Sequence, residues 1–381
     1  MKKLTLLSLT AFALALTVIT GCNHQPPLKK LTLNLPVQTQ TYNDTKYRSV
    51  TVSGGDNSPI TNPLTDAGAT LGRVLFYDPR LSVNNTISCS SCHKQQFGFG
   101  DNQPFSTGFQ GQLTLRNTPA IINAANKSVF FWDGRVNSLE TQTLMPVKNH
   151  IEMGLENENA LSAKLGSISD YPGLFQSAFG STEITTEKIS MALSQFVRSI
   201  ASYPQNGLLT GDALAGRILF LEKYKCSSCH AGSNLGGAAI FFPYYPVTHA
   251  PTSVANTSNI GLDLVYSDQG IQAINGDPAQ NGYFVIPALR NVALTAPYMH
   301  DGRYSTLSQV IDHYSTGILP HPNLDPILID TNFAAGQILV KTGNPVKMNI
   351  SDIEKKQLIA YLTSLTDYSI TTDQRFSSPF K

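Results

Sequence analysis

The chain has 381 residues, a formal net charge of +1 at pH 7, and only 14% charged residues. Its length suffices for two domains of ordinary size. The near-neutral balance and the lack of any block of basic residues argue against nucleic acid as a partner.

Residues 1–21 have the pattern of an export signal. Two lysines precede an uncharged run over residues 4–19, which at 16 residues is shorter than the roughly 20 that cross a bilayer. The run ends in Ile-Thr-Gly-Cys, which resembles the lipobox of bacterial lipoproteins, where cleavage leaves a lipid-linked cysteine. We therefore predict a lipoprotein signal peptide over residues 1–21, a lipid anchor at Cys22, and a periplasm-facing protein on the outer membrane. The alternative is an ordinary signal peptide with an incidental Cys22.

Residues 22–60 are rich in Pro, Thr, Asn and Gln. This composition is typical of an extended linker, so we predict a tether over these residues. No later apolar run reaches membrane-spanning length, so we expect the globular part to begin at residue 61 and to be held near the membrane by the tether.

The globular part contains two diverged copies of one pattern. Each copy has a Gly-Arg-aliphatic-Leu-Phe segment ahead of Cys-Ser-Ser-Cys-His, followed by Leu-Arg-Asn, by Asp-Gly-Arg, and by a leucine four residues later. These motifs begin at residues 72, 89, 115 and 133 in the first copy and at residues 216, 226, 289 and 301 in the second. We infer an internal duplication, with an N-terminal domain over residues 61–205, a C-terminal domain over residues 206–370 and a tail over residues 371–381.

Each copy closes with a helical pattern. Apolar residues at helical spacing predict a helix near residues 189–200 and another near residues 358–365. Ser351 and Glu354 have the spacing of a capping box that would start the second helix. Strand signals are few. We therefore predict a mainly α-helical fold of two cytochrome-c-like haem domains packed face to face.

Each copy carries one complete Cys-x-x-Cys-His unit. In this motif the two thiols add to the vinyl groups of haem, and the adjacent histidine is held beneath the iron as its proximal ligand. A lone Cys-x-x-Cys could instead be a redox dithiol or half of a zinc site. Two complete units in an exported chain predict two covalently bound haems c, attached through Cys89, Cys92 and His93 and through Cys226, Cys229 and His230.

The duplication also indicates which residue could lie opposite the proximal histidine of each iron. Aligned on Asp-Gly-Arg and the following leucine, Pro146 of the first copy matches Tyr314 of the second. Proline cannot ligate iron and tyrosine can, so we predict an open first haem and a six-coordinate second haem. A slip of one residue would pair Met145 with His313, both possible ligands, and the alignment by itself leaves that register open. Further candidates for the second iron are Met299 and Met348.

Two polar side chains flank Pro146 in the sequence, Gln142 and Glu152. A carboxylate in a pocket of low polarity can move the proton of a bound peroxide, an effect of about 10²–10⁴-fold. The alternative for Glu152 is a solvated helix position. Trp132, the only tryptophan, is most simply a core residue, and its alternative role is an electron relay between two redox centres.

These residues together resemble the bacterial dihaem cytochrome c peroxidases and their relative MauG, the dihaem oxidase that matures methylamine dehydrogenase. The likeness covers residues 71–367, and three motifs carry it: Leu-Phe-Tyr-Asp-Pro-Arg-Leu-Ser before the first haem, Phe-Trp-Asp-Gly-Arg, and Leu-Arg-Asn-Val-Ala-Leu-Thr-Ala-Pro-Tyr-Met-His-Asp-Gly-Arg. The resemblance implies active-site roles for Gln142 and Glu152 and an inter-haem role for Trp132. It also implies a calcium ion between the haems, bound by Asn117, Thr295 and Pro297.

Two departures from the classical peroxidases stand out. Phe109 occupies the position of the histidine that caps their peroxidatic iron, and Tyr314 occupies the position of their distal methionine, which is the MauG-like choice. The expected function is reduction of hydrogen peroxide at the N-terminal haem. Electrons would come through the C-terminal haem from a small redox protein of the cytochrome c or cupredoxin type. The alternatives are a MauG-like oxidase acting on a protein partner and a dihaem electron carrier.

Overall fold

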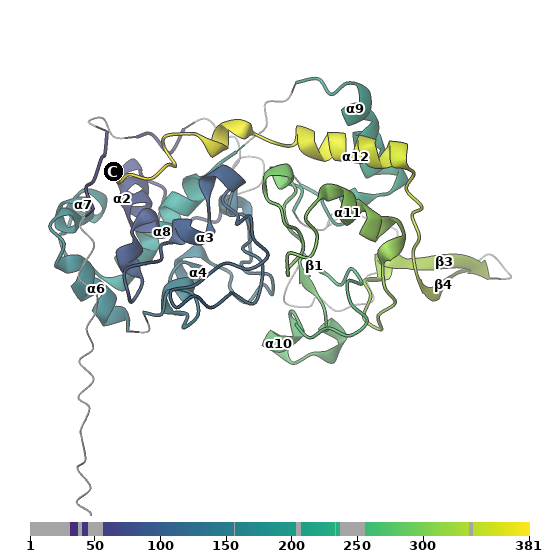
Figure 1. The fold of residues 1–381 in the computed structure, drawn as a ribbon, viewed down its shortest axis with the longest axis horizontal. Helices are drawn as coiled ribbons and strands as arrows, with labels where there is room; N and C mark the ends of the chain where they lie inside the picture. Colours follow the sequence, from purple (N-terminus) through teal and green to yellow (C-terminus); the bar gives the residue numbers. More distant parts are fainter. Residues whose placement is uncertain are drawn as a thin grey trace, which may run out of the picture.

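The computed structural model describes residues 31–36, 40–44, 56–155, 157–202, 207–232, 234–236, 256–334 and 338–381. The predicted signal peptide, the lipid anchor at Cys22 and much of the predicted tether lie outside these residues. The described part of the predicted tether is not an extended linker, because Tyr42 is 1% exposed and belongs to the core of the N-terminal half. Within them the chain is mainly helical with a few short strands, as predicted, and it forms two halves that lie side by side (Figure 1). None of the helices in this described part is long and apolar enough to cross a membrane.

The N-terminal half packs its longer helices around the first Cys-x-x-Cys-His motif. Its elements are α2 (Asp66–Tyr77), η1 (Pro79–Leu81), α3 (Cys89–Cys92), η2 (Gln95–Phe97), η3 (Ala124–Asn126), α4 (Leu139–Gln142), α5 (Met145–Lys148), α6 (Glu158–Gly166), α7 (Asp170–Phe179) and α8 (Thr186–Ser199). Helix α8 is the amphipathic helix predicted near residues 189–200. It lies against α2 with almost no gap, because a Cβ added to Gly72 would come within 1.9 Å of the Ala192 carbonyl oxygen.

The C-terminal half repeats this crossing. Its elements are α9 (Gly211–Ile218), η4 (Leu219–Lys223), η5 (Cys226–Ser228), α10 (Gln272–Asn275), η6 (Pro278–Gln280), η7 (Val292–Leu294), α11 (Leu307–Asp312), η8 (His313–Gly317), η9 (Pro326–Leu328), α12 (Asp352–Ser364) and η10 (Tyr368–Thr371). A Cβ on Gly216 of α9 would lie 1.9 Å from the Gln357 carbonyl oxygen of α12. The predicted capping box of Ser351 and Glu354 starts α12.

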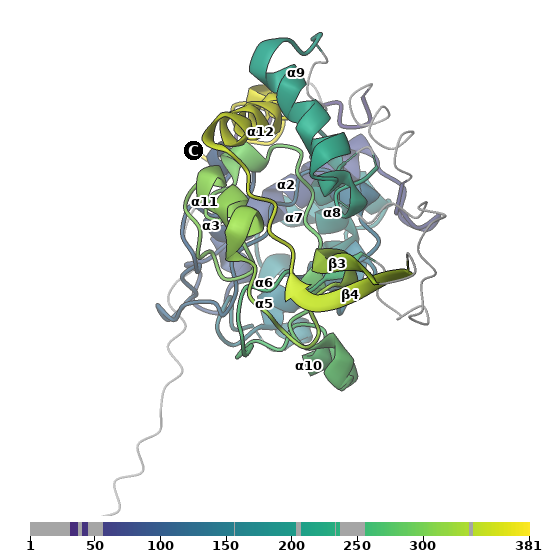
Figure 2. The ribbon, with the colours of Figure 1, turned by 90° about the vertical axis from the view of Figure 1, so that its right-hand side faces the viewer.

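Strands occur only in the C-terminal half of the described chain. The two-residue strands β1 (Thr257–Ser258) and β2 (Phe284–Val285) pair antiparallel. The antiparallel strands β3 (Ile329–Ala334) and β4 (Ile338–Pro345) form a hairpin that projects from the side farthest from the N-terminal half (Figures 1 and 2).

One long loop has matching turns in both halves. Residues 121–139 match residues 289–307 without a gap. The glycines of both Asp-Gly-Arg turns are left-handed, with φ of 62° and 68°, and each arginine donates to its own aspartate. Ser138 and Thr306 then cap the helices that follow, α4 and α11. These matches agree with an internal duplication.

The Leu-Arg-Asn repeat has a different structural alignment from the one in the sequence. Asn291 begins η7 with a left-handed φ of 63°, and its N–H donates to the Leu365 carbonyl after α12. Its counterpart is Asn123, with φ of 57°, which begins η3 and donates to the Ile200 carbonyl after α8. The sequence alignment paired Asn291 with Asn117, and the structure gives Asn117 a separate place between the halves.

Residues 366–381, called the strap below, leave α12 and run back across the N-terminal half (Figure 1). Ile370 and Phe376 are 0% and 1% exposed and belong to the core of that half. Two side chains of α2 donate to strap carbonyls at 2.6 and 2.7 Å. The sequence analysis assigned residues 371–381 to a tail, whereas the structure uses them to complete the core of the N-terminal half.

Candidate active site

A cavity of about 800 Å³ lies between the first Cys-x-x-Cys-His motif and the C-terminal half. Most residues predicted for the first site line it, namely Cys89, Cys92, His93, Asn117, Trp132, Gln142, Pro146 and Glu152. The C-terminal half contributes residues 267–269 and 285–288 to the wall. The fold therefore gathers distant parts of the sequence around one space of the size that small molecules and cofactors occupy.

Both motif histidines are held in the same way. Nδ1 of His93 lies 3.0 Å from the carbonyl oxygen of Phe99, and Nδ1 of His230 lies 3.1 Å from that of Leu235. Because a carbonyl oxygen only accepts, each bond places the ring proton on Nδ1 and leaves the lone pair on Nε2. Burial keeps both rings neutral by lowering their pKa, to about 4 for His230. Neutral imidazole with a free Nε2 is the form that binds iron.

The motif cysteines are unsuited to thiolate chemistry. Burial raises the pKa of Cys89 to about 12 and of Cys92 to about 11, and it does the same for Cys226 and Cys229. Redox-active dithiols show the opposite shift. Among the described residues there is also no cluster of three or more His, Cys, Asp or Glu side chains that could hold a metal ion. The motifs therefore fit thioether attachment of haem better than a dithiol or a zinc site.

The cavity also contains a partly buried cation that the sequence analysis did not single out. Lys127 lines the wall, and its Nζ donates to the carbonyl oxygen of Ala120 at 3.1 Å. Burial lowers the pKa of Lys127 to about 8. A buried ammonium is costly unless it is paired with an anion. A ligand with carboxylates, such as haem with its propionates, would supply that anion.

The far wall of the cavity comes from α4, α5 and the loop after them. Ser138 caps α4, which carries Gln142, and α5 begins one turn later with Pro146 in its first turn. Pro146 lines the main cavity, whereas Met145 lines only a smaller neighbouring one of about 270 Å³. Pro146, which cannot ligate iron, therefore shares the main cavity with the first motif. The register taken from the repeat stays a prediction.

Glu152 stands between the two cavities, whose linings it shares. Its loop is fixed by Asn149, whose Oδ1 accepts from the N–H groups of Ile151 and Glu152 at 2.8 and 3.2 Å. Burial raises the pKa of the Glu152 carboxyl, against a smaller opposite effect of the Arg135 charge. Glu152 is thus partly buried on a cavity wall, which differs from the solvated helix position considered as the alternative.

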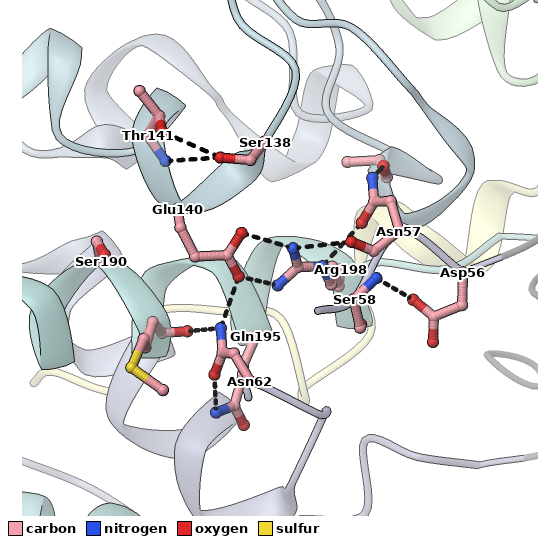
Figure 3. Close-up of polar contacts among 12 residues, drawn as sticks. Asp56, Asn57, Ser58, Asn62, Ser138, Glu140, Thr141, Ser190, Gln195 and Arg198 are labelled. Atoms are coloured by element: carbon pink, nitrogen blue, oxygen red, sulfur yellow. Dashed lines mark hydrogen bonds and ion pairs between the residues drawn. The ribbon is translucent and has the colours of Figure 1, made fainter. Parts of the chain in front are cut away.

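A buried ion pair holds the helix that carries Gln142 (Figure 3). Arg198 of α8 is fully buried, and it donates to Glu140 of α4 at 2.6 and 2.9 Å and to Asn57 at 2.8 Å. Glu140 also accepts from Asn62 at 2.7 Å. Since Gln142 follows Glu140 by two residues, this network sets the position of the predicted active-site amide.

Phe109, at the position where the resemblance places the capping histidine of the classical peroxidases, packs against the Glu152 loop. Its N–H donates to the Glu152 carbonyl at 3.0 Å, and its ring packs on Gly154. The preceding Gly108 is pressed against the backbone, since an added Cβ would lie 1.7 Å from the Ile151 carbonyl oxygen. Phe109 is not among the described residues that line the cavity. The loop that carries Phe109 is thus held against the backbone of the Glu152 loop.

Comparison with known proteins identifies the family to which the chain belongs. A family model described as di-haem cytochrome c peroxidase matches residues 66–206. The methylamine utilization protein MauG of Methylorubrum extorquens is 30% identical over 334 residues, which cover 81% of this chain and 80% of that protein. The chain belongs to the di-haem cytochrome c peroxidase and MauG family.

Other members support the assignment. The cytochrome c551 peroxidase of Pseudomonas aeruginosa is 33% identical over 65% of this chain and 72% of its own. A crystal structure of a MauG-like protein associated with microbial copper homeostasis superimposes with a TM-score of 0.71 at 33% identity, over 85% of this chain and 96% of that one. This family member is therefore an oxidoreductase of a dihaem c-type group.

The second motif of this dihaem family member faces Tyr314. The pKa of Tyr314 is raised well above its ordinary value, first by burial and then by the nearby thiols of Cys229 and Cys226. The neighbouring His313 is 3% exposed, and its Nε2 donates to the Ile260 carbonyl at 2.9 Å. The structure thus brings Tyr314, and not the bonded Nε2 of His313, to the second pair of cysteines.

Trp132 lies where the two halves of the dihaem protein meet. Its Nε1 donates to the Asn117 carbonyl at 2.8 Å, and its own carbonyl accepts from Val285 in β2 at 2.8 Å. The Asn117 N–H in turn donates to the His300 carbonyl at 2.7 Å. In the repeated loop, Trp132 and His300 are equivalent positions. Asn117 therefore forms hydrogen bonds to equivalent residues of the two halves, to the Trp132 ring through its carbonyl and to the His300 carbonyl through its N–H.

Arg116 reinforces this junction. It donates to Asp133, beside Trp132, at 2.5 Å and to Asp268 of the C-terminal half at 2.6 and 2.8 Å. Its guanidinium also lies 5.7 Å from the ring centre of Phe284. The sequence reveals the motif around Arg116 but not its partner Asp268, which no repeat or spacing identifies.

The three residues expected to bind calcium are near the same junction. The Asn117 side chain donates its Nδ2 to the carbonyls of Gln103 and Pro104 at 3.1 and 3.2 Å, which leaves Oδ1 as the atom able to bind a cation. Thr295 lies against the loop after His93, since a Cβ on Gly98 would be 3.2 Å from its Cγ2. Pro297 follows two residues later in the same loop. An amide oxygen and backbone carbonyls are ligand types that calcium prefers.

Proposed function

We propose that this chain reduces hydrogen peroxide at a haem held by Cys89, Cys92 and His93. Electrons would reach it from a second haem held by Cys226, Cys229, His230 and Tyr314. One observation carries the proposal. Glu152, Gln142 and the non-ligating Pro146 share a single cavity with the first motif.

Bound in this cavity, haem c would supply an iron centre able to bind peroxide and to exchange single electrons. The residues present fit it. Cys89 and Cys92 would form the thioether links, and Nε2 of His93 would ligate the iron. The ammonium of Lys127 would pair with a haem carboxylate.

Glu152 and Gln142 would manage the protons of peroxide. The Glu152 carboxylate would accept a proton from peroxide and return it to the oxygen that leaves as water. Two electrons from the reduced donor and two further protons from solvent would convert the other oxygen to a second water. Burial raises the pKa of Glu152 and so makes it better at holding that proton in transit. Gln142 donates its amide N–H to orient the peroxide. The smaller cavity next to Glu152 would serve as the route by which peroxide and water reach the carboxylate.

Electrons would pass from the second haem across the junction at Trp132, with a small redox protein of the cytochrome c or cupredoxin type as donor. A calcium ion held by Asn117, Thr295 and Pro297 would stabilise that junction. The lipid anchor at Cys22 would keep the enzyme at the periplasmic face of the outer membrane, where such donors are found.

A second candidate is a MauG-like oxidase, which would withdraw electrons from a protein partner through the same junction. The position of Tyr314 favours this reading, because tyrosinate ligation stabilises the ferric state and lowers the potential of the second haem. A plain electron carrier is disfavoured, because electron transfer alone requires neither an open iron site nor a carboxylate beside it.

The decisive experiment compares the fully oxidised and half-reduced proteins in their reaction with peroxide. Because Phe109 does not cap the first site, both forms should react at similar rates, and steady-state turnover should require only a reduced donor. If the half-reduced form alone reacts, another residue caps the iron. If peroxide reacts but no small redox protein sustains turnover, the result favours the MauG-like oxidase that acts on a protein partner. A ferric EPR spectrum should contain one high-spin and one low-spin haem.

A further inference from the structure

The hydrogen bond that orients His93 depends on a residue under backbone strain. The acceptor carbonyl belongs to Phe99, which has a left-handed φ of 58° and is 0% exposed. A bulky residue in this conformation is strained and persists only where its surroundings impose it. The Phe99 N–H donates to the Lys94 carbonyl at 2.9 Å, so this turn and the side chains that pack on Phe99 together fix where the acceptor for His93 lies.

The strap packs on Phe99. The ring of Phe376 meets the ring of Phe99 edge to face, with centroids 6.4 Å apart and planes at 84°. Phe376 is itself 1% exposed and touches the rings of Phe196 and Tyr42. Its carbonyl accepts from the Tyr77 hydroxyl at 2.6 Å. The aromatic ring that fixes Phe99 is thus fixed in turn from several sides.

A second contact ties the strap to the same loop. Gln95 follows His93 by two residues, and its Nε2 donates to two strap carbonyls, those of Ile370 and Asp373, each at 2.9 Å. One amide thereby joins η2 to η10. Near the start of the strap, the N–H of Asp367 donates to Asn291 of the C-terminal half at 2.8 Å. A continuous chain of contacts runs from the C-terminal half to the histidine of the first motif.

We propose that the strap positions the proximal ligand of the first haem, with Gln95 and Phe376 as positioning residues that act through Phe99 on the hydrogen bond to His93. This inference deepens the proposed function and rests on its assignment of His93 as the iron ligand. The strap, which follows the second copy in sequence, would then help to set the properties of the haem in the first copy.

The physical effect follows from what that hydrogen bond does. A carbonyl that accepts from Nδ1 draws the ring proton away and makes Nε2 more basic, and a more basic ligand strengthens the iron–histidine bond and favours ferric iron. If the strap relaxes, the Phe99 carbonyl moves from its position and the bond lengthens. The iron–histidine bond should weaken and the reduction potential of the first haem should rise.

The test uses the full-length holoprotein with three single variants. Gln95→Leu removes both donations at similar side-chain size, and Phe376→Leu keeps an apolar side chain but removes the ring edge. Tyr368→Ala is the matched control, because it deletes an aromatic side chain from the same segment that is 59% exposed. The readouts are the iron–histidine stretching frequency of the reduced protein by resonance Raman and the midpoint potentials of both haems.

The proposal predicts a lower stretching frequency and a higher potential at the first haem in Gln95→Leu and Phe376→Leu, with the second haem unchanged and Tyr368→Ala like the wild type. Values for both strap variants that match those of Tyr368→Ala would overturn it. Equal shifts at both haems would also overturn it, because they indicate general loosening. Neither readout involves peroxide, so a protein without peroxidase activity still tests the strap.

Discussion

Replacing Glu152 with glutamine tests the proton-transfer role with little disturbance of the fold. The loop is held by backbone contacts that do not use the carboxylate. The Glu152 N–H donates to Asn149 at 3.2 Å, and its carbonyl accepts from Phe109 at 3.0 Å. Glutamine has the same shape but cannot take a proton at neutral pH. Both haems should therefore remain attached in Glu152→Gln while proton transfer fails.

The expected loss is about 10²–10⁴-fold in the rate of reaction with peroxide, the usual contribution of a positioned acid–base group. Each factor of ten corresponds to about 1.4 kcal/mol, so the barrier should rise by about 3–5 kcal/mol. The other carboxylates that line the cavity cannot compensate, because Arg116 binds both Asp133 and Asp268. Gln142 is a neutral amide and accepts no proton.

Stopped-flow mixing of the oxidised protein with peroxide across a pH series provides the measurement. Burial raises the pKa of Glu152, so its basic form is lost as pH falls through a value above that of an ordinary glutamate. The wild-type rate should therefore fall on the acid side, and the rate of Glu152→Gln should not follow that fall. An unchanged rate in the variant, with both haems attached, would remove Glu152 from the mechanism.

The same shift has a consequence for stability. Because the folded-state pKa of Glu152 is higher than its unfolded value, the folded protein binds more protons in the window between them, and stability falls as pH rises through that window. Glutamine carries no such penalty. Glu152→Gln should therefore unfold at a higher temperature than the wild type at neutral pH, and a lower unfolding temperature would contradict this sign.

Three further changes test other parts of the site. Tyr314→Phe should convert the low-spin ferric EPR signal of the second haem to high spin, and if His313→Ala does so instead, the register is wrong by one residue. Lys127→Met should lower the midpoint potential of the first haem in redox titration, because removing a nearby positive charge favours ferric iron, and an unchanged potential would argue against its pairing with haem. Glu140→Ala should destabilise the protein in denaturant titration by about 3–5 kcal/mol, the cost of leaving a buried charge such as Arg198 unpaired. Adding Arg198→Met should recover part of that loss.

Local sequence patterns predicted the helices well. The capping box at Ser351 and Glu354 and the amphipathic pattern near residues 189–200 depend on neighbours within one or two turns, which the sequence displays directly. Gly72 and Gly216 appeared only as parts of a repeated motif. Their physical reason, a helix crossing that leaves no room for Cβ, requires the partner helix to be known.

Contacts between distant segments were the part that the sequence could not supply. The Leu-Arg-Asn repeat paired Asn117 with Asn291, whereas the backbone conformation and the bonds after the closing helices pair Asn123 with Asn291. Identity over three residues is weak evidence for structural equivalence here, because the alignment needs a gap between Leu-Arg-Asn and the Asp-Gly-Arg match that follows. Lys127 was missed for a similar reason, since a lysine is ordinarily exposed and nothing around it signals burial.

The strap also constrains the order in which the protein can be assembled. Arg73 of α2 binds the carbonyl of Ser377, 304 residues farther along the chain. At the usual pace of synthesis, about 5–20 residues per second, a ribosome needs roughly 15–60 s to cover that distance. Throughout that interval the N-terminal half lacks Ile370 and Phe376, two fully enclosed members of its core. The N-terminal half should therefore complete its core only after the end of the chain has been made. An N-terminal fragment produced alone should be a poor substitute for the domain within the whole protein.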